Sequence, residues 1–175
     1  RTDRRYGGGR GQAIFPGKKN IAIKVTVGVD QSSSIDNDDN RRTLGEVAGI
    51  LKEATKATRD GIKFFTVDTE VKNIQPVKRL EDLKLIGGGG TRMGAAFEYI
   101  NSLPPRDRPD LFVLATDGFL LDEDWENIYR HVTRTHNGRL LYRTVILVTN
   151  KERYDACPMK VKNATTVICI DDKEE

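Results

Sequence analysis

Short segments in which hydrophobic and polar residues alternate predict six β-strands. Segment 21–30 carries Ile or Val at nearly every second position and ends at an aspartate, which is the pattern of a strand with a buried face. Segment 62–67 predicts a second strand, and segment 70–77 follows so closely that a hairpin and an antiparallel third strand are expected. Segment 110–116 is almost continuously apolar, as in a parallel strand buried on both faces. The last two strands are predicted at 140–148 and 165–170.

Apolar residues at helical spacing occupy the intervals between these strands. The predicted helices cover 44–60, 91–103 and 125–132. The first ends at a glycine, and the second opens after four glycines and stops at a pair of prolines. The weakly patterned stretch 150–163 is long enough for a further short helix.

This alternation of strands and helices indicates an α/β fold. We expect a doubly wound, mostly parallel six-stranded sheet with one antiparallel edge strand and helices on both faces. In such sheets, ligands bind beyond the carboxyl ends of the parallel strands. Residues 1–20 are basic and rich in glycine, so we expect a linker or tail there and one folded domain over 21–175.

Composition excludes several classes of protein. The net charge of +3, from 29 basic and 26 acidic residues, is nearly balanced and does not by itself indicate nucleic-acid binding. No apolar stretch approaches the length of roughly 20 residues that a membrane helix needs. Cys157 and Cys169 are too few for a disulfide framework and lack metal-type spacing, so we expect a cytoplasmic protein. Because the sequence opens on Arg1 rather than Met, we expect it to be part of a longer protein.

Oxygen-bearing side chains gather where predicted strands end or helices begin. Asp30, Ser32 and Ser34 follow the first strand, Thr91 opens a helix, and Asp117 follows the apolar strand. Carboxylates and hydroxyls are hard ligands that suit Mg²⁺ or Mn²⁺ rather than zinc. Each feature alone also has an ordinary reading, as a helix N-cap or a turn. Their joint occurrence at several element ends predicts a metal site.

The three motifs D-Q-S-S-S at 30–34, G-G-G-G-T at 87–91 and A-T-D-G at 115–118 together resemble the metal-ion-dependent adhesion site, or MIDAS, of von Willebrand factor A (VWA) domains. The resemblance covers about 21–171 and implies the strand order 3-2-1-4-5-6. Within the superfamily, the chain is most similar to a bacterial group of C-terminal VWA-like domains. The N-terminal half of those proteins resembles a metallopeptidase, and the proteins often occur beside MoxR-type AAA+ ATPases.

The resemblance also implies roles for individual residues. The residues that would hold the metal, directly or through water, are Asp30, Ser32, Ser34, Thr91 and Asp117. A Glu or Asp of a protein partner would complete the coordination shell, which makes the site a docking point and not a reaction centre. The domain alone is expected to be a monomer with no catalytic residues.

Three further residues are candidates for the second shell of the metal or for contact with the partner. Asp68 follows the second predicted strand and is either a turn-forming residue or part of the site. Gly90 allows the backbone to pass close to the ion. Arg92 stands where the bacterial group commonly has an acid, so its charge either weakens metal binding or attracts a partner carboxylate.

Two other classes of function compete with this interpretation. A metal-dependent hydrolase or phosphotransferase would use Asp30 as its nucleophile. No second acid follows two residues later, and His131 and His136 do not share a helix face. The Arg/Gly tail at 1–19 could grip nucleic acid electrostatically, but such a stretch is more often a linker.

Overall fold

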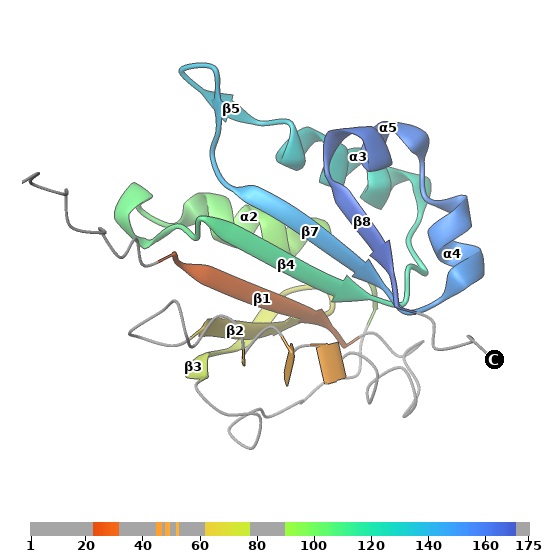
Figure 1. The fold of residues 1–175 in the computed structure, drawn as a ribbon, viewed down its shortest axis with the longest axis horizontal. Helices are drawn as coiled ribbons and strands as arrows, with labels where there is room; N and C mark the ends of the chain where they lie inside the picture. The colour runs from red at the N-terminus through yellow and green to blue at the C-terminus, as the bar shows by residue number, and fades with distance from the viewer. Residues whose placement is uncertain are drawn as a thin grey trace, which may run out of the picture.

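The computed structural model describes residues 23–31, 45, 46, 48, 49, 52, 62–77 and 90–170. Within these ranges, six strands form one sheet in the order β3-β2-β1-β4-β7-β8 (Figure 1). These strands are β1 (Val25–Asp30), β2 (Ile62–Val67), β3 (Val71–Val77), β4 (Leu111–Thr116), β7 (Arg143–Val148) and β8 (Thr166–Cys169). All neighbours are parallel except β2 and β3, which form the expected antiparallel hairpin.

The remaining elements lie between these strands along the chain. They are α2 (Gly94–Ser102), the 3₁₀ turn η2 (Pro105–Asp107), α3 (Asp122–Val132), β5 (Thr135–His136), β6 (Arg139–Leu140), α4 (Lys151–Ala156) and α5 (Met159–Ala164). Residues 45, 46, 48, 49 and 52 are also helical, within the predicted helix over 44–60. None of the helices in the described ranges has the length and apolar character needed to span a bilayer.

The position of each strand in the sheet explains its pattern of burial. β1 lies between β2 and β4, and all six of its residues are buried. β3 lies at the edge, and its residues alternate between half-buried and exposed until Val77. The edge position also accommodates Pro76, since proline has no N–H to donate to a second neighbour.

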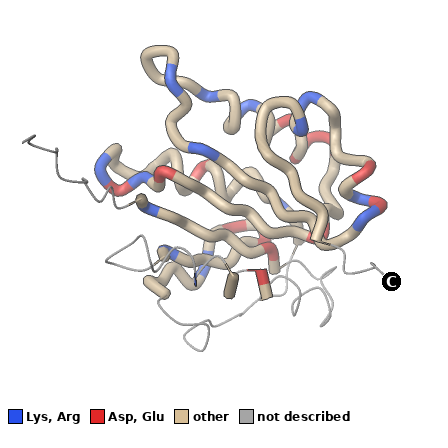
Figure 2. Tube along the Cα trace, in the orientation of Figure 1, with Lys and Arg blue, Asp and Glu red and all other residues tan. Residues whose placement is uncertain are grey.

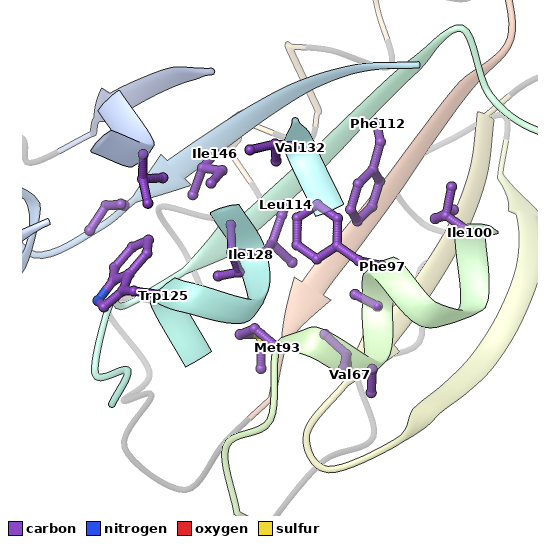
Figure 3. Close-up of a cluster of buried hydrophobic side chains, with 14 of the residues drawn as sticks. Val67, Met93, Phe97, Ile100, Phe112, Leu114, Trp125, Ile128, Val132 and Ile146 are labelled. Atoms are coloured by element: carbon purple, nitrogen blue, oxygen red, sulfur yellow. The ribbon is translucent and has the colours of Figure 1, made fainter. Parts of the chain in front are cut away.

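The main core lies between the sheet and helices α2, α3 and α5 (Figure 3). Its centre is aromatic, with the Phe112 ring stacked on Phe65 at 5.9 Å and met edge-on by Phe97 at 5.3 Å. Gly28 provides the space for this cluster, because a Cβ atom there would lie 2.7 Å from a ring carbon of Phe65. The opposite face of the sheet carries a second apolar cluster that includes Val27.

The sheet confirms the mixed α/β class, but its strand order differs in detail from 3-2-1-4-5-6. The predicted strand 140–148 is broken at residues 141 and 142, and its first part instead pairs with β5 as a separate two-stranded sheet. The short β5–β6 hairpin therefore takes two places in the strand count, and the last two strands of the main sheet become β7 and β8.

Two predicted helices also need correction. α2 begins at Gly94, three residues after the predicted start at Thr91. The stretch 150–163, which was expected to hold one short helix, holds α4 and α5. Pro158 separates them, because its ring is tolerated only at the start of a helix and not inside one.

Candidate metal-binding site

Two buried aspartates lie at the carboxyl edge of the sheet, on neighbouring strands. Asp30 is the last residue of β1 and has no exposed surface, and Asp117 directly follows β4 and is 1% exposed. Parallel pairing of the two strands, with Val29 opposite Ala115, brings both strand ends to the same edge. The fold thus brings together two of the predicted metal ligands.

Thr116 links the two strand ends through a chain of hydrogen bonds. Its hydroxyl donates to Asp30 Oδ2 at 2.7 Å and accepts the backbone N–H of Gly118 at 3.0 Å. Gly118 has a φ of +83°, which favours glycine, and a Cβ there would lie 2.8 Å from Arg153 Cβ. The turn after β4 is therefore fixed tightly beside Asp30.

The carboxylate of Asp117 is only half satisfied. Its Oδ1 accepts the backbone N–H of Phe119 at 2.9 Å. Its Oδ2 is buried and has no hydrogen-bond partner within the described part of the chain. A buried carboxylate oxygen without a donor is costly, and a cation beside it would supply the missing interaction. The donor set of this edge therefore fits a metal ion.

Thr91 lies in a segment that is attached to the end of β2. The backbone N–H of Arg92 donates to the carbonyl of Asp68 at 2.7 Å, and β2 ends beside Asp30, with Val67 opposite it. The N-cap of α2 is Met93, which makes no side-chain capping bond. Thr91 is thus not the cap of the helix, and its half-buried side chain lies at the same edge as the two aspartates.

Both carboxylate oxygens of Asp68 accept hydrogen bonds from the hairpin that β2 and β3 form. Its Oδ2 accepts from Lys72 Nζ at 2.9 Å, and its Oδ1 accepts the N–H groups of Thr69 and Glu70. Burial alone would raise the pKa of this carboxyl group, but the hydrogen bonds outweigh it and lower the pKa to about 2. Asp68 is therefore ionised and shapes the turn, while its carbonyl holds the segment that carries Thr91.

The charge of Arg92 is directed toward the helices. Its guanidinium pairs with Glu98 of α2 at 2.6 Å. Burial raises the pKa of Asp124 in α3, and the positive charge of Arg92 acts against that rise. Arg92 is thus partly neutralised by acids of its own domain.

Gly90, the neighbour of Thr91, is exposed, and a Cβ there would lie 3.2 Å from Thr69 Cγ2.

Ser32 and Ser34 lie outside the described residues, as does the tail at 1–20. Within the described ranges, no three side chains of His, Cys, Asp or Glu gather as a metal-binding group. The predicted ligand set contains only two such residues, and its other members are hydroxyls.

The sequence analysis did not single out four side chains around this edge. Thr116 lies inside the A-T-D-G motif, and its hydroxyl directly before a strand-end aspartate is a usable signal for this role. Phe119 and Leu121 follow Asp117 and are 44% and 73% exposed, which is unusual for large apolar side chains. The Arg153 guanidinium lies 3.8 Å above the ring of Phe119. Sequence pattern gave no indication of that contact.

The sheet topology and the family comparison together define a VWA-like protein. A model of the family described as VWA-like domain (DUF2201) matches residues 25–122, and the chain belongs to this family. Members of the VWA-like class typically mediate metal-dependent protein interactions. A search of the curated proteins finds no match.

Solved structures share the fold at low sequence identity. Proximal thread matrix protein 1 from the mussel byssus, with a zinc-occupied MIDAS motif, has a TM-score of 0.53 and 14% identity. The match covers 85% of this chain and 43% of that protein. A mutant of the PilB minor pilin from Streptococcus sanguinis has a TM-score of 0.52 and 9% identity, over 84% of this chain and 57% of the pilin. The chain therefore spans less than two thirds of either neighbour.

Proposed function

We propose that this domain is a metal-dependent protein-interaction module in which a Glu or Asp of a partner completes the coordination of a bound ion. The residues that would hold the ion, directly or through water, are Asp30, Ser32, Ser34, Thr91 and Asp117. The observation that carries the proposal is the pair of buried aspartates on neighbouring strand ends, with Asp117 Oδ2 lacking a hydrogen-bond partner in the described part of the chain. When bound, the ion supplies positive charge to which a partner carboxylate attaches.

Mg²⁺ is the ion that we propose, with Mn²⁺ as the alternative that fits the same donors. Two carboxylates and three hydroxyls are hard oxygen ligands, and waters or a partner can complete an octahedron around either ion. The mussel protein holds zinc in its MIDAS motif, which supports a divalent ion at this place in the fold. Zinc without any Cys or His ligand is the weaker fit.

We propose binding rather than catalysis because neither histidine of the chain, the residue type that most often transfers protons in enzymes, lies beside the two aspartates. The chain has two histidines. His131 contacts Asn101 at the far ends of α3 and α2, with 2.8 Å between Nδ1 and Nδ2, and His136 lies in the β5–β6 hairpin. Neither histidine lies at the carboxyl edge of the sheet. A hydrolase that uses Asp30 would need another base.

The exposed rim beside Asp117 supports a macromolecular partner. Phe119 and Leu121 present apolar surface, and Arg153 adds a positive charge over the ring of Phe119. A partner loop with an acidic residue beside an apolar one matches this combination of an ion and an apolar rim. Protein interfaces commonly place such anchors around a central polar contact.

Calorimetric titration of EDTA-treated protein with Mg²⁺, Mn²⁺, Ca²⁺ and Zn²⁺ tests the metal site. We expect one site per chain that binds Mg²⁺ or Mn²⁺ and is lost in Asp30→Asn and Asp117→Asn. Asp107→Asn is the matched control, because it removes an exposed acid at the other end of the sheet. Equal metal binding by all the variants would overturn the assignment of the ligands.

The wider setting is part of the same proposal. We propose that the domain works inside a longer cytoplasmic protein with a metallopeptidase-like region, together with a MoxR-type AAA+ ATPase. A binding assay between the two proteins, run in Mg²⁺ and again in EDTA, tests this partner. Binding in Mg²⁺ that Asp30→Asn abolishes would support the pairing, and identical binding in EDTA would contradict it.

A further inference from the structure

A pocket of about 640 Å³ lies at the opposite end of the sheet from the two aspartates. It opens between the turn that precedes β4, at residues 105–110, and the β5–β6 hairpin. β4 has six residues, so its length alone separates the two ends by roughly 20 Å. The pocket is thus a different site, and its argument does not depend on the metal.

Basic side chains outnumber acidic ones in the lining of this pocket. Arg108, Arg134 and Arg139 line it together with a single acid, Asp110. The carboxylate of Asp110 already accepts the backbone N–H of Lys24 at 2.8 Å. Figure 2 shows Lys and Arg positions along the hairpin, and basic beside acidic positions at the turn before β4. The pocket therefore carries an excess of positive charge.

Two backbone carbonyls hold the guanidinium of Arg108 in one orientation. Its Nε donates to the carbonyl of Leu103 at 2.9 Å, and its Nη2 donates to the carbonyl of Asn101 at 3.1 Å. These bonds fix the plane of the guanidinium and leave the N–H groups of Nη1 for a ligand. A guanidinium that is already ordered loses less conformational entropy when it binds a planar anion.

Arg134 and Arg139 have no acidic partner within ion-pair distance in the described part of the chain. The charges of Arg134 and Arg108 both affect the pKa of the buried Tyr142 hydroxyl. Burial raises the pKa of Tyr142 to about 12, and the charges of both arginines act against that rise. Uncompensated cations that converge on one pocket attract an anion.

The rest of the lining is mixed, with the polar residues Asn101, Thr135 and His136 beside apolar ones. Pro105, Pro109, Leu140 and Leu141 contribute to the lining. The apolar part of the lining lowers the local dielectric and strengthens the interaction between a guanidinium and a bound anion. The volume suits a small organic molecule, because ligand pockets commonly measure about 300–1,000 Å³.

We propose that this pocket binds a small molecule through a multiply charged oxyanion, a phosphate or a carboxylate group, held by Arg108, Arg134 and Arg139. The two arginines that lack acidic partners supply the attraction, and the fixed Arg108 supplies orientation. Phosphate and carboxylate share the paired oxygens that a guanidinium fork recognises, so both belong to the proposed class.

Titration calorimetry of the EDTA-treated full chain with inorganic phosphate and with citrate tests the proposal. We expect saturable binding of at least one anion, and roughly a tenfold or larger loss of affinity in the double variant Arg134→Gln/Arg139→Gln. Binding of phosphate alone would assign a phosphate ligand, and binding of citrate alone would assign a carboxylate. The matched control is Arg130→Gln/Arg153→Gln, which removes the same charge outside the pocket.

An NMR titration locates the bound anion. We expect backbone amide shifts to change at 105–110 and 134–141 and to stay constant at 116–119. No saturable binding of either anion would overturn the proposal. An equal loss of affinity in the control variant would also overturn it, because it would show general charge attraction without a pocket.

Discussion

The hydroxyl of Thr116 is the atom through which the ends of β1 and β4 are joined. Replacing it in Thr116→Val leaves the Gly118 N–H without its acceptor and removes a 2.7 Å donor from Asp30 Oδ2. We expect a loss of about 1–3 kcal/mol in the free energy of unfolding, because a buried polar group then lacks its partner. We also expect weaker Mg²⁺ binding. Urea denaturation followed by circular dichroism, beside calorimetry, measures both effects.

Thr116→Ser is the matched control, because it keeps the hydroxyl and removes only a methyl group. We expect it to retain most of the stability and the affinity for Mg²⁺. If Thr116→Val bound Mg²⁺ as tightly as the wild type, the hydrogen bond would have no part in positioning Asp30.

Gly28 is a second residue whose size is fixed by its neighbours. A Cβ there would lie 2.7 Å and 2.9 Å from two ring carbons of Phe65 and 3.3 Å from one of Phe112. We expect Gly28→Ala to destabilise the fold by about 1–3 kcal/mol, because two stacked rings cannot both move away. Gly49→Ala is the control, since a Cβ at this exposed helical position meets no atom of the described residues within 4 Å, apart from its chain neighbours and the backbone of its own helix. It should stabilise the protein by up to about 1 kcal/mol, and equal losses in both variants would contradict the steric argument.

The sequence was sufficient for the position of Asp30 and Asp117, because each follows an apolar strand and parallel strands end at one edge. The sequence did not predict that Thr116 joins the two strand ends, or that the segment carrying Thr91 is bonded to the Asp68 carbonyl. Both contacts depend on which carbonyl or carboxylate lies across the strand boundary, and this is a tertiary relation. No local pattern encodes the bond from Arg92 N–H to the Asp68 carbonyl.

At the scale of elements, the type of the strongly periodic segments was predicted correctly, whereas the short hairpin that connects α3 to β7 was not predicted. The apolar stripe of α3 and the continuous run of β4 determine their type locally. The β5–β6 hairpin has two residues in each strand, too few for a periodic signal. Its turn residues Asn137 and Gly138 both have positive φ. Because Asn-Gly is the strongest short hairpin signal, this element could have been found.

The contact between α2 and α3 predicts a dependence of stability on pH. Burial lowers the pKa of His131 from its ordinary value of 6.5, with Glu98 opposing and Arg134 reinforcing the change. Asn101 Nδ2 lies 2.8 Å from His131 Nδ1. Since Tyr142 OH lies 3.4 Å from the amide oxygen of Asn101, the NH₂ group faces the histidine, which then accepts as a neutral ring.

Protonation of His131 therefore favours the unfolded chain. We expect the contribution of this contact to be complete above pH 6.5 and to be lost as the pH falls from 6.5 through the lower folded-state value. Urea denaturation at pH values from 7.5 to 5 measures the slope. His131→Gln should flatten it, whereas the exposed control His136→Gln should retain it. A slope unchanged in His131→Gln would assign the dependence to other groups.

At the scale of the whole molecule, the sheet separates two kinds of surface. Its carboxyl edge carries buried acids and an apolar rim, while its amino end carries the arginine pocket. The doubly wound arrangement was predictable from the alternation of strands and helices. The charge separation was not, because it depends on residues from the turn before β4 and from the hairpin meeting in space.

Buried carboxylates that bind a metal ion lower the stability of the metal-free protein, so binding function and stability trade off at such a site. Asp117 Oδ2 is buried without a hydrogen-bond partner in the described part of the chain, and a buried carboxylate oxygen without a donor destabilises the fold when no ion is bound. Asp117→Asn removes the carboxylate charge. We expect the metal-free variant to be more stable than the metal-free wild type by about 1 kcal/mol or more, which corresponds to roughly 2–4 °C in the unfolding temperature.

Mg²⁺ should reverse this order. An ion that binds only the folded protein stabilises it increasingly with concentration, so the unfolding temperature of the wild type should rise with Mg²⁺ while that of Asp117→Asn stays constant. Scanning calorimetry in EDTA and at increasing Mg²⁺ measures the crossing. A variant that is less stable without metal and still gains stability from Mg²⁺ would mean that Asp117 belongs to the fold alone.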